Sequence, residues 1–161
     1  MSSLPGAARS TGAAAVLALI ASCSNPNANA SVVIATQVSP GTVLVGDSVS
    51  VIATVFVSGS KPVSVETNTC GGPFEVVDSR GQVVGPGLAT PCLAVSIPIV
   101  VEPGGQYALQ GYWTGLSHQS SDGKPVYVPP GEYRIRGKVT ILERSTPVRG
   151  TLVGITLTGA G

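Results

Sequence analysis

The sequence predicts an all-β protein folded as an antiparallel β-sandwich, and three observations support this class. The chain of 161 residues has 21 glycines and 13 prolines, a mixture that suits many short strands joined by tight turns. Apolar and polar residues alternate in several segments, whereas no segment beyond the N-terminus repeats apolar residues at helical spacing. Turn signals recur about every 8 to 12 residues and divide the chain into about eight to ten strands.

The clearest strand runs from Glu132 to Ile141. The positions of one parity, which predict a face packed in the core, are Tyr133, Ile135, Gly137, Val139 and Ile141. The other parity carries charge, and Arg134, Arg136 and Lys138 form a basic stripe on the outer face. We interpret this stripe first as a solvated face that discourages pairing between sheet edges, and alternatively as a site for an acidic partner.

Further strands are expected at residues 32–38, 42–45, 48–57, 63–67, 74–78, 82–84, 92–101, 106–113 and 149–158. In the segment 48–57, valines share one parity, while Ile52 and Phe56 on the other face predict that this face is partly covered too. Pro98 lacks an N–H group, which places the strand 92–101 at a sheet edge. Residues 114–124 are expected to form the longest polar loop.

The N-terminal segment has the zones of an export signal. Arg9 precedes an apolar run from Gly12 to Ala21, which is too short to span a bilayer because a spanning helix needs about 20 apolar residues. The run ends at Ile20-Ala21-Ser22-Cys23, which resembles the lipobox of bacterial lipoproteins. This resemblance implies cleavage before Cys23, lipid chains on that residue, and an anchor in a bacterial membrane after export.

The lipoprotein interpretation divides the chain into three parts. Residues 1–22 are the signal peptide, residues 23–31 a flexible tether, and residues 32–161 one sandwich domain. The alternative is ordinary secretion, with cleavage after Ala28-Asn29-Ala30 and loss of Cys23. The formal charge of +1 gives no basic excess, so we expect no nucleic-acid partner.

Two cysteines remain for the exported domain. We expect Cys70 and Cys92 to form a disulfide, because an even pair in an exported protein persists in oxidised form. Closing a loop of about 22 residues would stabilise the fold by about 3 kcal/mol in the chain-entropy model. The rival interpretation, a metal site, lacks a CxxC motif and further histidines, so no metal or other cofactor is expected.

The sequence shows no pattern of a catalytic site. His118 is the one histidine of the chain and lies among Ser and Gly residues, where a solvated side chain is the ordinary outcome. The eight acidic residues are scattered and form no metal-binding or acid–base pair. No glycine motif for phosphate binding opens a helix. We therefore expect no catalytic residues and no enzyme.

Candidate binding residues lie near the segment 114–124. Trp113 shares the parity of the apolar residues of its strand and is expected in the core, so Tyr112 is the exposed aromatic residue. The polar loop that follows, with His118 and Lys124, is the expected contact surface. Tyr112, His118 and Lys124 are the candidate binding residues.

From Val63 to Ile141 the order of features resembles the BsuPI-type intracellular proteinase inhibitor domain. The matching segments are Thr67-Asn68, Phe74-Glu-Val-Val-Asp-Ser-Arg-Gly81, Val101-Glu-Pro-Gly104, Tyr112-Trp113 and Val128-Pro-Pro-Gly-Glu-Tyr133. The resemblance implies an immunoglobulin-like sandwich and inhibition of a serine proteinase. The export signal and the pair Cys70 and Cys92 depart from the family pattern, and no reactive-site residue can be matched.

Three functions follow as hypotheses. The first is a membrane-anchored, non-enzymatic module of the cell envelope that binds another protein. The second is a proteinase inhibitor of the BsuPI type, and the third is a structural envelope protein. In each case the expected partners are a membrane, through the lipid anchor, and, in the first two, another protein.

Overall fold

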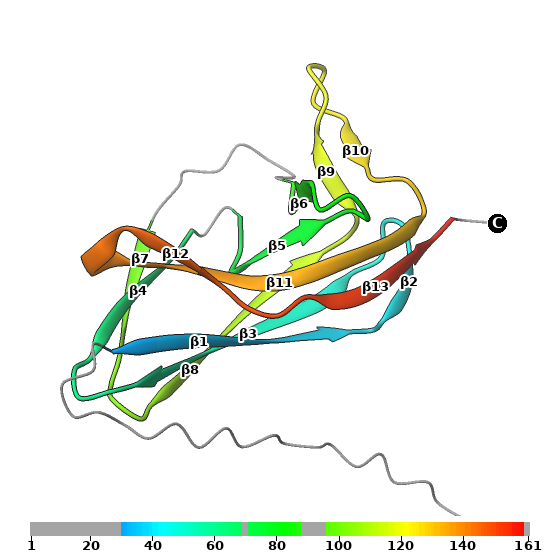
Figure 1. The fold of residues 1–161 in the computed structure, drawn as a ribbon. Helices are drawn as coiled ribbons and strands as arrows, with labels where there is room; N and C mark the ends of the chain where they lie inside the picture. Colours follow the sequence, from blue (N-terminus) through cyan, green and yellow to red (C-terminus); the bar gives the residue numbers. More distant parts are fainter. Residues whose placement is uncertain (1–29, 69–70, 88–95, 160–161) are drawn as a thin grey trace, which may run out of the picture.

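The computed structural model describes residues 30–68, 71–87 and 96–159, which form thirteen strands and one 3-10 turn (Figure 1). The strands are β1 (Ser31–Ser39), β2 (Thr42–Leu44), β3 (Val49–Ser58), β4 (Val63–Asn68), β5 (Phe74–Val77), β6 (Val83–Gly85), β7 (Ser96–Val101), β8 (Gln106–Trp113), β9 (Leu116–Gln119), β10 (Pro125–Tyr127), β11 (Gly131–Ile141), β12 (Thr146–Arg149) and β13 (Val153–Thr158). The 3-10 turn, Leu142–Arg144, joins β11 to β12.

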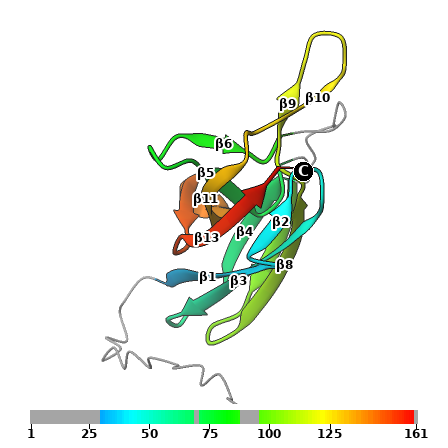
Figure 2. The same cartoon turned by 90° about the vertical axis from the view of Figure 1, so that its right-hand side faces the viewer.

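The strands form a sandwich of two sheets, with a separate two-stranded hairpin (Figures 1 and 2). One sheet has the order β1-β3-β8. The other has the order β2-β13-β11-β4-β7, with β12 and β5 also paired to the long strand β11 and β6 paired to β5. All pairs are antiparallel except β2 with β13.

This strand order is that of an immunoglobulin-like sandwich, which confirms the predicted fold class. The order β1-β3-β8 corresponds to strands A, B and E of that fold, and β13-β11-β4 to strands G, F and C. Tyr133, near the start of β11, donates its hydroxyl to the carbonyl oxygen of Pro129 at 2.7 Å, four residues upstream. This is the tyrosine corner that immunoglobulin-like sandwiches place at the start of strand F.

The apolar residues that alternate with polar ones in the sequence form the core of the sandwich. The inward positions of β3, from Val49 to Val57, and of β11, from Tyr133 to Ile141, are all buried. Trp113 is 2% exposed and meets Tyr133 edge to face, with ring centroids 5.8 Å apart. The two longest strands therefore carry the packed faces of the two sheets.

Several sequence predictions need correction. The chain has more and shorter strands than expected: the segment 149–158 is divided between β12 and β13, which begins at Val153. Residues 114–124, expected to be the longest polar loop, contain β9 and the turn that leads to β10, so they form part of a hairpin. Ile52 is half-buried, as expected for a partly covered outer face of β3, but Phe56 on the same face is 40% exposed, contrary to our expectation.

Other predictions lie outside the described residues. These are the signal peptide with Cys23, the Ala-x-Ala site, and the pair Cys70 and Cys92. Within the described ranges, no helix has the length and apolar character needed to cross a membrane. Pro98 lies in β7, which pairs with β4 alone among the described strands, as expected for an edge.

Candidate functional site

The hairpin of β9 and β10 is the most prominent feature of the surface. It lies near one end of the sandwich and projects across the direction of the long strands in both views (Figures 1 and 2). Pro125 pairs with Gln119 and Val126 with His118, whereas Tyr127 pairs with Leu116, so the antiparallel hairpin has a bulge near its base. A projecting hairpin whose strands are already paired can enter a concave surface of a partner without first having to fold.

Hydrogen bonds within the turn fix the tip of the hairpin. The N–H of Ser120 donates to the carbonyl oxygen of Lys124, and the N–H of Gly123 donates to that of Ser120, both at 2.9 Å. Lys124 also forms an ion pair of 2.9 Å with Asp122, whose other carboxylate oxygen accepts the hydroxyl of Ser120. The hydrogen bonds from Ser120 and Lys124 hold the pKa of Asp122 below its ordinary value.

The base of the hairpin is bound to the core. The indole N–H of Trp113 and the backbone N–H of Gly87 both donate to the carbonyl oxygen of Leu116, at 3.0 and 2.9 Å. Gly87 packs so closely that a Cβ atom there would lie 2.3 Å from the backbone of Ser117. The buried indole and this backbone contact therefore set the direction in which the hairpin projects.

The structure brings two of the three candidate binding residues together. His118 lies on β9 with its side chain exposed, and Lys124 lies in the turn that follows. Tyr112 is 63% exposed, as expected, but it lies on the outer face of the sheet β1-β3-β8, opposite Ser50. Trp113 is buried, which confirms the division of roles between these two neighbours.

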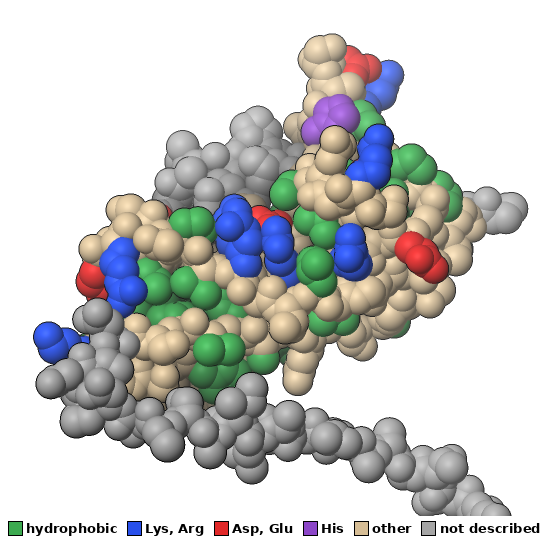
Figure 3. All heavy atoms as spheres, in the orientation of Figure 1, with side chains coloured by type: hydrophobic (Ala, Val, Ile, Leu, Met, Phe, Trp, Pro, Cys, Tyr) green, Lys and Arg blue, Asp and Glu red, His purple; other side chains and the backbone are tan. Residues whose placement is uncertain are grey.

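The basic stripe on β11 forms part of an ion-pair cluster. Glu75 on β5 is 3% exposed, and its Oε1 accepts hydrogen bonds from Nε of Arg136 at 2.6 Å and from Nε of Arg149 at 2.9 Å. Nζ of Lys138 lies 3.5 Å from Oε2. Three cations thus meet one carboxylate on the outer face of the larger sheet, and Lys and Arg side chains lie in a row over β11 in Figure 3.

The pKa of Glu75 follows from opposing effects. Burial raises it, but the hydrogen bonds and positive charges of Arg136 and then Arg149 outweigh burial, so the pKa is lowered. Sequence reasoning found Arg136 and Lys138 but missed Glu75 and Arg149, which come from different strands. A charged residue between Phe74 and Val76 in a strand buried along its whole length was the available signal.

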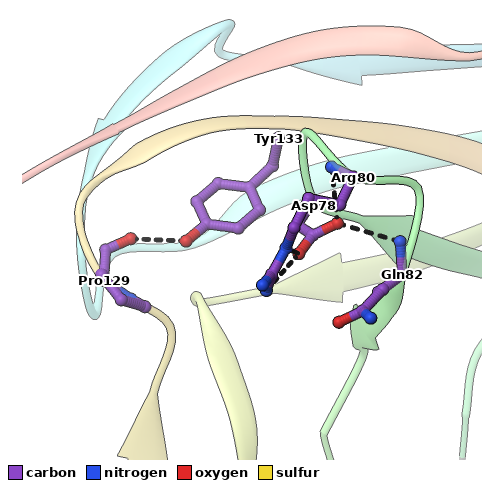
Figure 4. Close-up of polar contacts among 5 residues, drawn as sticks. All are labelled: Asp78, Arg80, Gln82, Pro129 and Tyr133. Carbon is purple, nitrogen blue, oxygen red and sulfur yellow. Dashed lines mark hydrogen bonds and ion pairs between the residues drawn. The ribbon is translucent and has the colours of Figure 1, made fainter.

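The turn between β5 and β6 lies beside the start of β11. Oδ1 of Asp78 accepts the N–H groups of Arg80 and Gln82, both at 2.9 Å, and Oδ2 accepts the Arg80 guanidinium at 3.0 Å (Figure 4). The hydrogen bond from Gln82 is the main cause of a lowered pKa at Asp78, ahead of the contribution of Arg80. The Asp78 charge and, more strongly, burial raise the pKa of Tyr133.

The described residues offer no assembled catalytic constellation. A cavity of about 540 Å³ on the outer face of β11 and β13 is lined by Glu132, Arg134, Ser79 and Thr156, without a histidine or thiol. Within the described ranges, no three His, Cys, Asp or Glu side chains gather as metal ligands. His118 contacts the hydroxyl of Ser117 at 3.3 Å, and no acidic residue of the described part of the chain is its hydrogen-bond partner.

Comparison with known proteins gives only distant similarity. No family model and no curated protein matches the chain. Among solved structures, a β-glucosidase from Erythrobacter marinus is 18% identical with a TM-score of 0.49, covering 80% of this chain and 16% of that enzyme. The CARDB domain of a Pyrococcus furiosus protein, in complex with di-metal ions, is 14% identical with a TM-score of 0.45, covering 80% of this chain and 89% of that domain.

A β-glucosidase from Listeria innocua gives a similar result, with 10% identity, a TM-score of 0.45, and coverage of 81% of this chain and 16% of the enzyme. The chain therefore spans less than a fifth of either glucosidase. All three TM-scores are below 0.5, so these similarities assign no function.

Proposed function

We propose that this protein is a lipid-anchored, non-enzymatic module of the bacterial cell envelope that binds another protein through the β9–β10 hairpin. The observation that supports this proposal is the position of the hairpin. It lies near the end of the sandwich opposite to the start of β1, and it projects across the direction of the long strands (Figure 1).

The register defines these two ends. Ser31, at the start of β1, pairs with Ser58 at the end of β3. At the other end, the N–H of Gly46 donates to the carbonyl oxygen of Thr114, directly before the hairpin, at 2.9 Å. The nine residues of β1 extend about 30 Å between the two ends at about 3.3 Å per residue. A domain anchored through Cys23 would then carry the hairpin away from the membrane.

The surface of the hairpin suits recognition of a protein. His118, Tyr127 and Lys124 are exposed on it, and Tyr127 offers an aromatic ring that is 41% exposed. Because the turn and the base are already fixed by hydrogen bonds, binding orders few additional groups and loses little conformational entropy.

The anchor has its own test. Replacing Cys23 with Ser removes the sulfur to which lipid would attach, so the variant should leave the membrane fraction and give a mature mass without acyl chains. Recovery of the Cys23→Ser variant in the membrane fraction at the wild-type level would contradict the anchor.

The binding function is tested by cross-linking in intact cells, followed by identification of the attached protein. Wild type is compared with His118→Ala/Tyr127→Ala on the hairpin and with Tyr107→Ala, a control whose ring is 44% exposed at the opposite end of the sandwich. We expect the hairpin variant to lose a cross-linked species that the control retains. Equal cross-linking by the two variants would assign the contact to another surface.

Inhibition of a serine proteinase is the alternative function, and the same projecting hairpin supports it, because a proteinase cleft accepts a convex segment. Titration of the protein against a panel of serine proteinases tests it, with the hairpin variant as the control. If no proteinase is slowed and no cross-linked species depends on the hairpin, the third hypothesis, a structural envelope protein, gains support.

A further inference from the structure

The outer face of the sheet β1-β3-β8 carries no charge. Its outward positions, five on β1, five on β3 and four on β8, are Ser31, Val33, Ala35, Gln37, Ser39, Ser50, Ile52, Thr54, Phe56, Ser58, Gln106, Ala108, Gln110 and Tyr112. The chain has nine Lys and Arg and eight Asp and Glu residues, and none of them occupies this neutral face. The charged strand residues of the sandwich lie on the other sheet, as the row along β11 in Figure 3 illustrates.

Two aromatic rings mark the ends of the neutral face. Tyr112 lies opposite Ser50, and Phe56 is six residues further along β3, about 20 Å away at the rise of a strand. The rings are 63% and 40% exposed. Between them lie the small residues Thr54 and Ala108 and the half-buried Ile52, so an extended ligand can contact both rings.

Hydrogen bonds position one of these rings. Nε2 of Gln110 donates to the hydroxyl oxygen of Tyr112 at 2.7 Å and lies 3.2 Å from Oγ of Ser50. Beside Tyr112 and Gln110 a hollow of about 300 Å³, lined by Gly72, Pro86 and Gly87, extends the surface past the edge of β8. The aromatic ring therefore stands in a fixed place beside a space that a ligand can fill.

We propose that the neutral face binds a neutral polysaccharide. The π-faces of Tyr112 and Phe56 carry partial negative charge, which attracts the polarised C–H groups on the face of a sugar ring. Gln37 and Gln106 each carry a donor and an acceptor, and Gln110 keeps its carbonyl oxygen as an acceptor, which matches hydroxyl groups that both donate and accept. An uncharged ligand suits this uncharged face, because binding then removes no charged group from water that lacks an oppositely charged partner.

Other occupants fit this face less well. Protein interfaces are enriched in Tyr, Trp, Phe, Met and Arg and depleted in Ser and Ala, whereas Ser, Ala, Thr and Gln dominate here. A second copy of the chain would bury a face of about 14 by 30 Å, or about 400 Å², roughly half of the 800 Å² per partner that a stable interface needs. A membrane surface would call for Lys, Arg or Trp, none of which is present on the neutral face.

Calorimetric titration of the full chain in detergent tests the proposal. The probes are five soluble neutral polysaccharides, namely a β-1,3-glucan, an α-1,4-glucan, a xylan, a mannan and an arabinogalactan, with polygalacturonate as the anionic control. We expect at least one neutral polymer to bind. Tyr112→Ala should weaken that binding at least fivefold, Tyr112→Trp should retain it, and Ala108→Glu should weaken it at least tenfold because it places a carboxylate at the centre of the neutral face.

The matched control is Tyr127→Ala on the hairpin, which should bind the polymer within twofold of wild type. The altered side chains are exposed, so fluorescence of the buried Trp113 should be unchanged in all variants and exclude misfolding. The proposal is overturned if no neutral polymer binds, if Tyr112→Ala and Ala108→Glu bind like wild type, or if sedimentation shows a dimer that Ala108→Glu dissociates. None of these results depends on the hairpin, so failure here is distinct from failure of the proposed protein-binding function.

Discussion

Replacing Glu75 with Gln should destabilise the fold strongly, although the side chain has nearly the same shape. Glu75 is 3% exposed and accepts hydrogen bonds from Arg136 and Arg149, with Lys138 at 3.5 Å. The substitution removes the negative charge, leaves three cations facing one another, and turns an amide N–H₂ group towards one of them. Loss of a partner from a fully buried ion pair costs about 3–5 kcal/mol.

The magnitude is smaller here because the cations are not fully buried. The side chains of Arg136, Lys138 and Arg149 are 28%, 42% and 43% exposed, so water can solvate them in part when the carboxylate charge is lost. The two hydrogen bonds from arginine contribute about 1.5–3 kcal/mol each when one partner is charged, and Gln retains part of one. We therefore expect the free energy of unfolding to fall by about 2–4 kcal/mol.

The assay is urea denaturation followed by the fluorescence of Trp113, the single tryptophan, which is buried in the core. Glu132→Gln is the matched control, since it makes the same chemical change at an exposed position of β11 and should leave the free energy of unfolding unchanged. A loss below about 0.5 kcal/mol for Glu75→Gln at pH 7, the scale of an ordinary surface substitution, would refute the reasoning.

The Glu75→Gln variant also tests how the stabilisation of the fold by Glu75 depends on pH. Because the pKa of Glu75 is lower in the folded protein than its ordinary value of 4.5, its stabilisation is present above that value. It is lost as the pH falls through the lower, folded pKa. The difference in unfolding free energy between wild type and Glu75→Gln should therefore shrink below about pH 4.5. A constant difference from pH 7 to pH 3 would show that the charge of Glu75 is not the cause.

Three further predictions concern the frame of the sandwich. Tyr133→Phe removes the hydroxyl that donates to Pro129 and should lower the free energy of unfolding, measured by urea denaturation, by about 1 kcal/mol. An unchanged free energy of unfolding would show that the tyrosine corner does not stabilise the fold. Gly137→Ala should cost about 1–3 kcal/mol in the same assay, because the new Cβ would lie 2.6 Å from Cγ2 of Ile34; Gly154→Ala, with open space around it, is the control. Gly87→Ala should disturb the contact between Gly87 and the base of the hairpin. Amide hydrogen exchange should then become faster in β9 and β10 and stay unchanged in β3. Exchange in β9 and β10 at the wild-type rate would contradict the role of Gly87.

The sequence predicted the features that repeat along one strand. Alternation identified β3 and β11, their inward faces and the fold class, because a strand with one buried face needs a period of two. It also predicted correctly that Trp113 is buried and that Tyr112 is exposed. Alternation alone does not ensure burial: Tyr107, the second residue of β8, has the same parity as Trp113 but is 44% exposed.

Features that depend on contacts between distant segments could not be predicted. Glu75 meets Arg149 across 74 positions of sequence, and Arg136 across 61, so the cluster exists only once β5, β11 and β12 are paired. Gly137 shows the same limit. A side chain at this position would collide with β1, where Oγ1 of Thr36 accepts the N–H of Gly137 at 2.8 Å. The neutral face likewise required the register of three strands, because each of β1, β3 and β8 alone shows only a few uncharged positions.

The two proposed contacts and the proposed anchor reinforce one another energetically. The neutral face and the hairpin use different elements of one rigid sandwich, so a polysaccharide and a protein can bind at the same time. A contact between uncharged sugars and two aromatic rings is expected to be weak by itself. A chain of eight residues, the length from Cys23 to Ala30, spans at most about 28 Å, and tethers of this length hold a binding site at an effective concentration in the millimolar range. If the proposed anchor exists, a weak neutral contact would therefore be sufficient to hold the domain against a polysaccharide, with the hairpin near the end of the sandwich away from the start of β1.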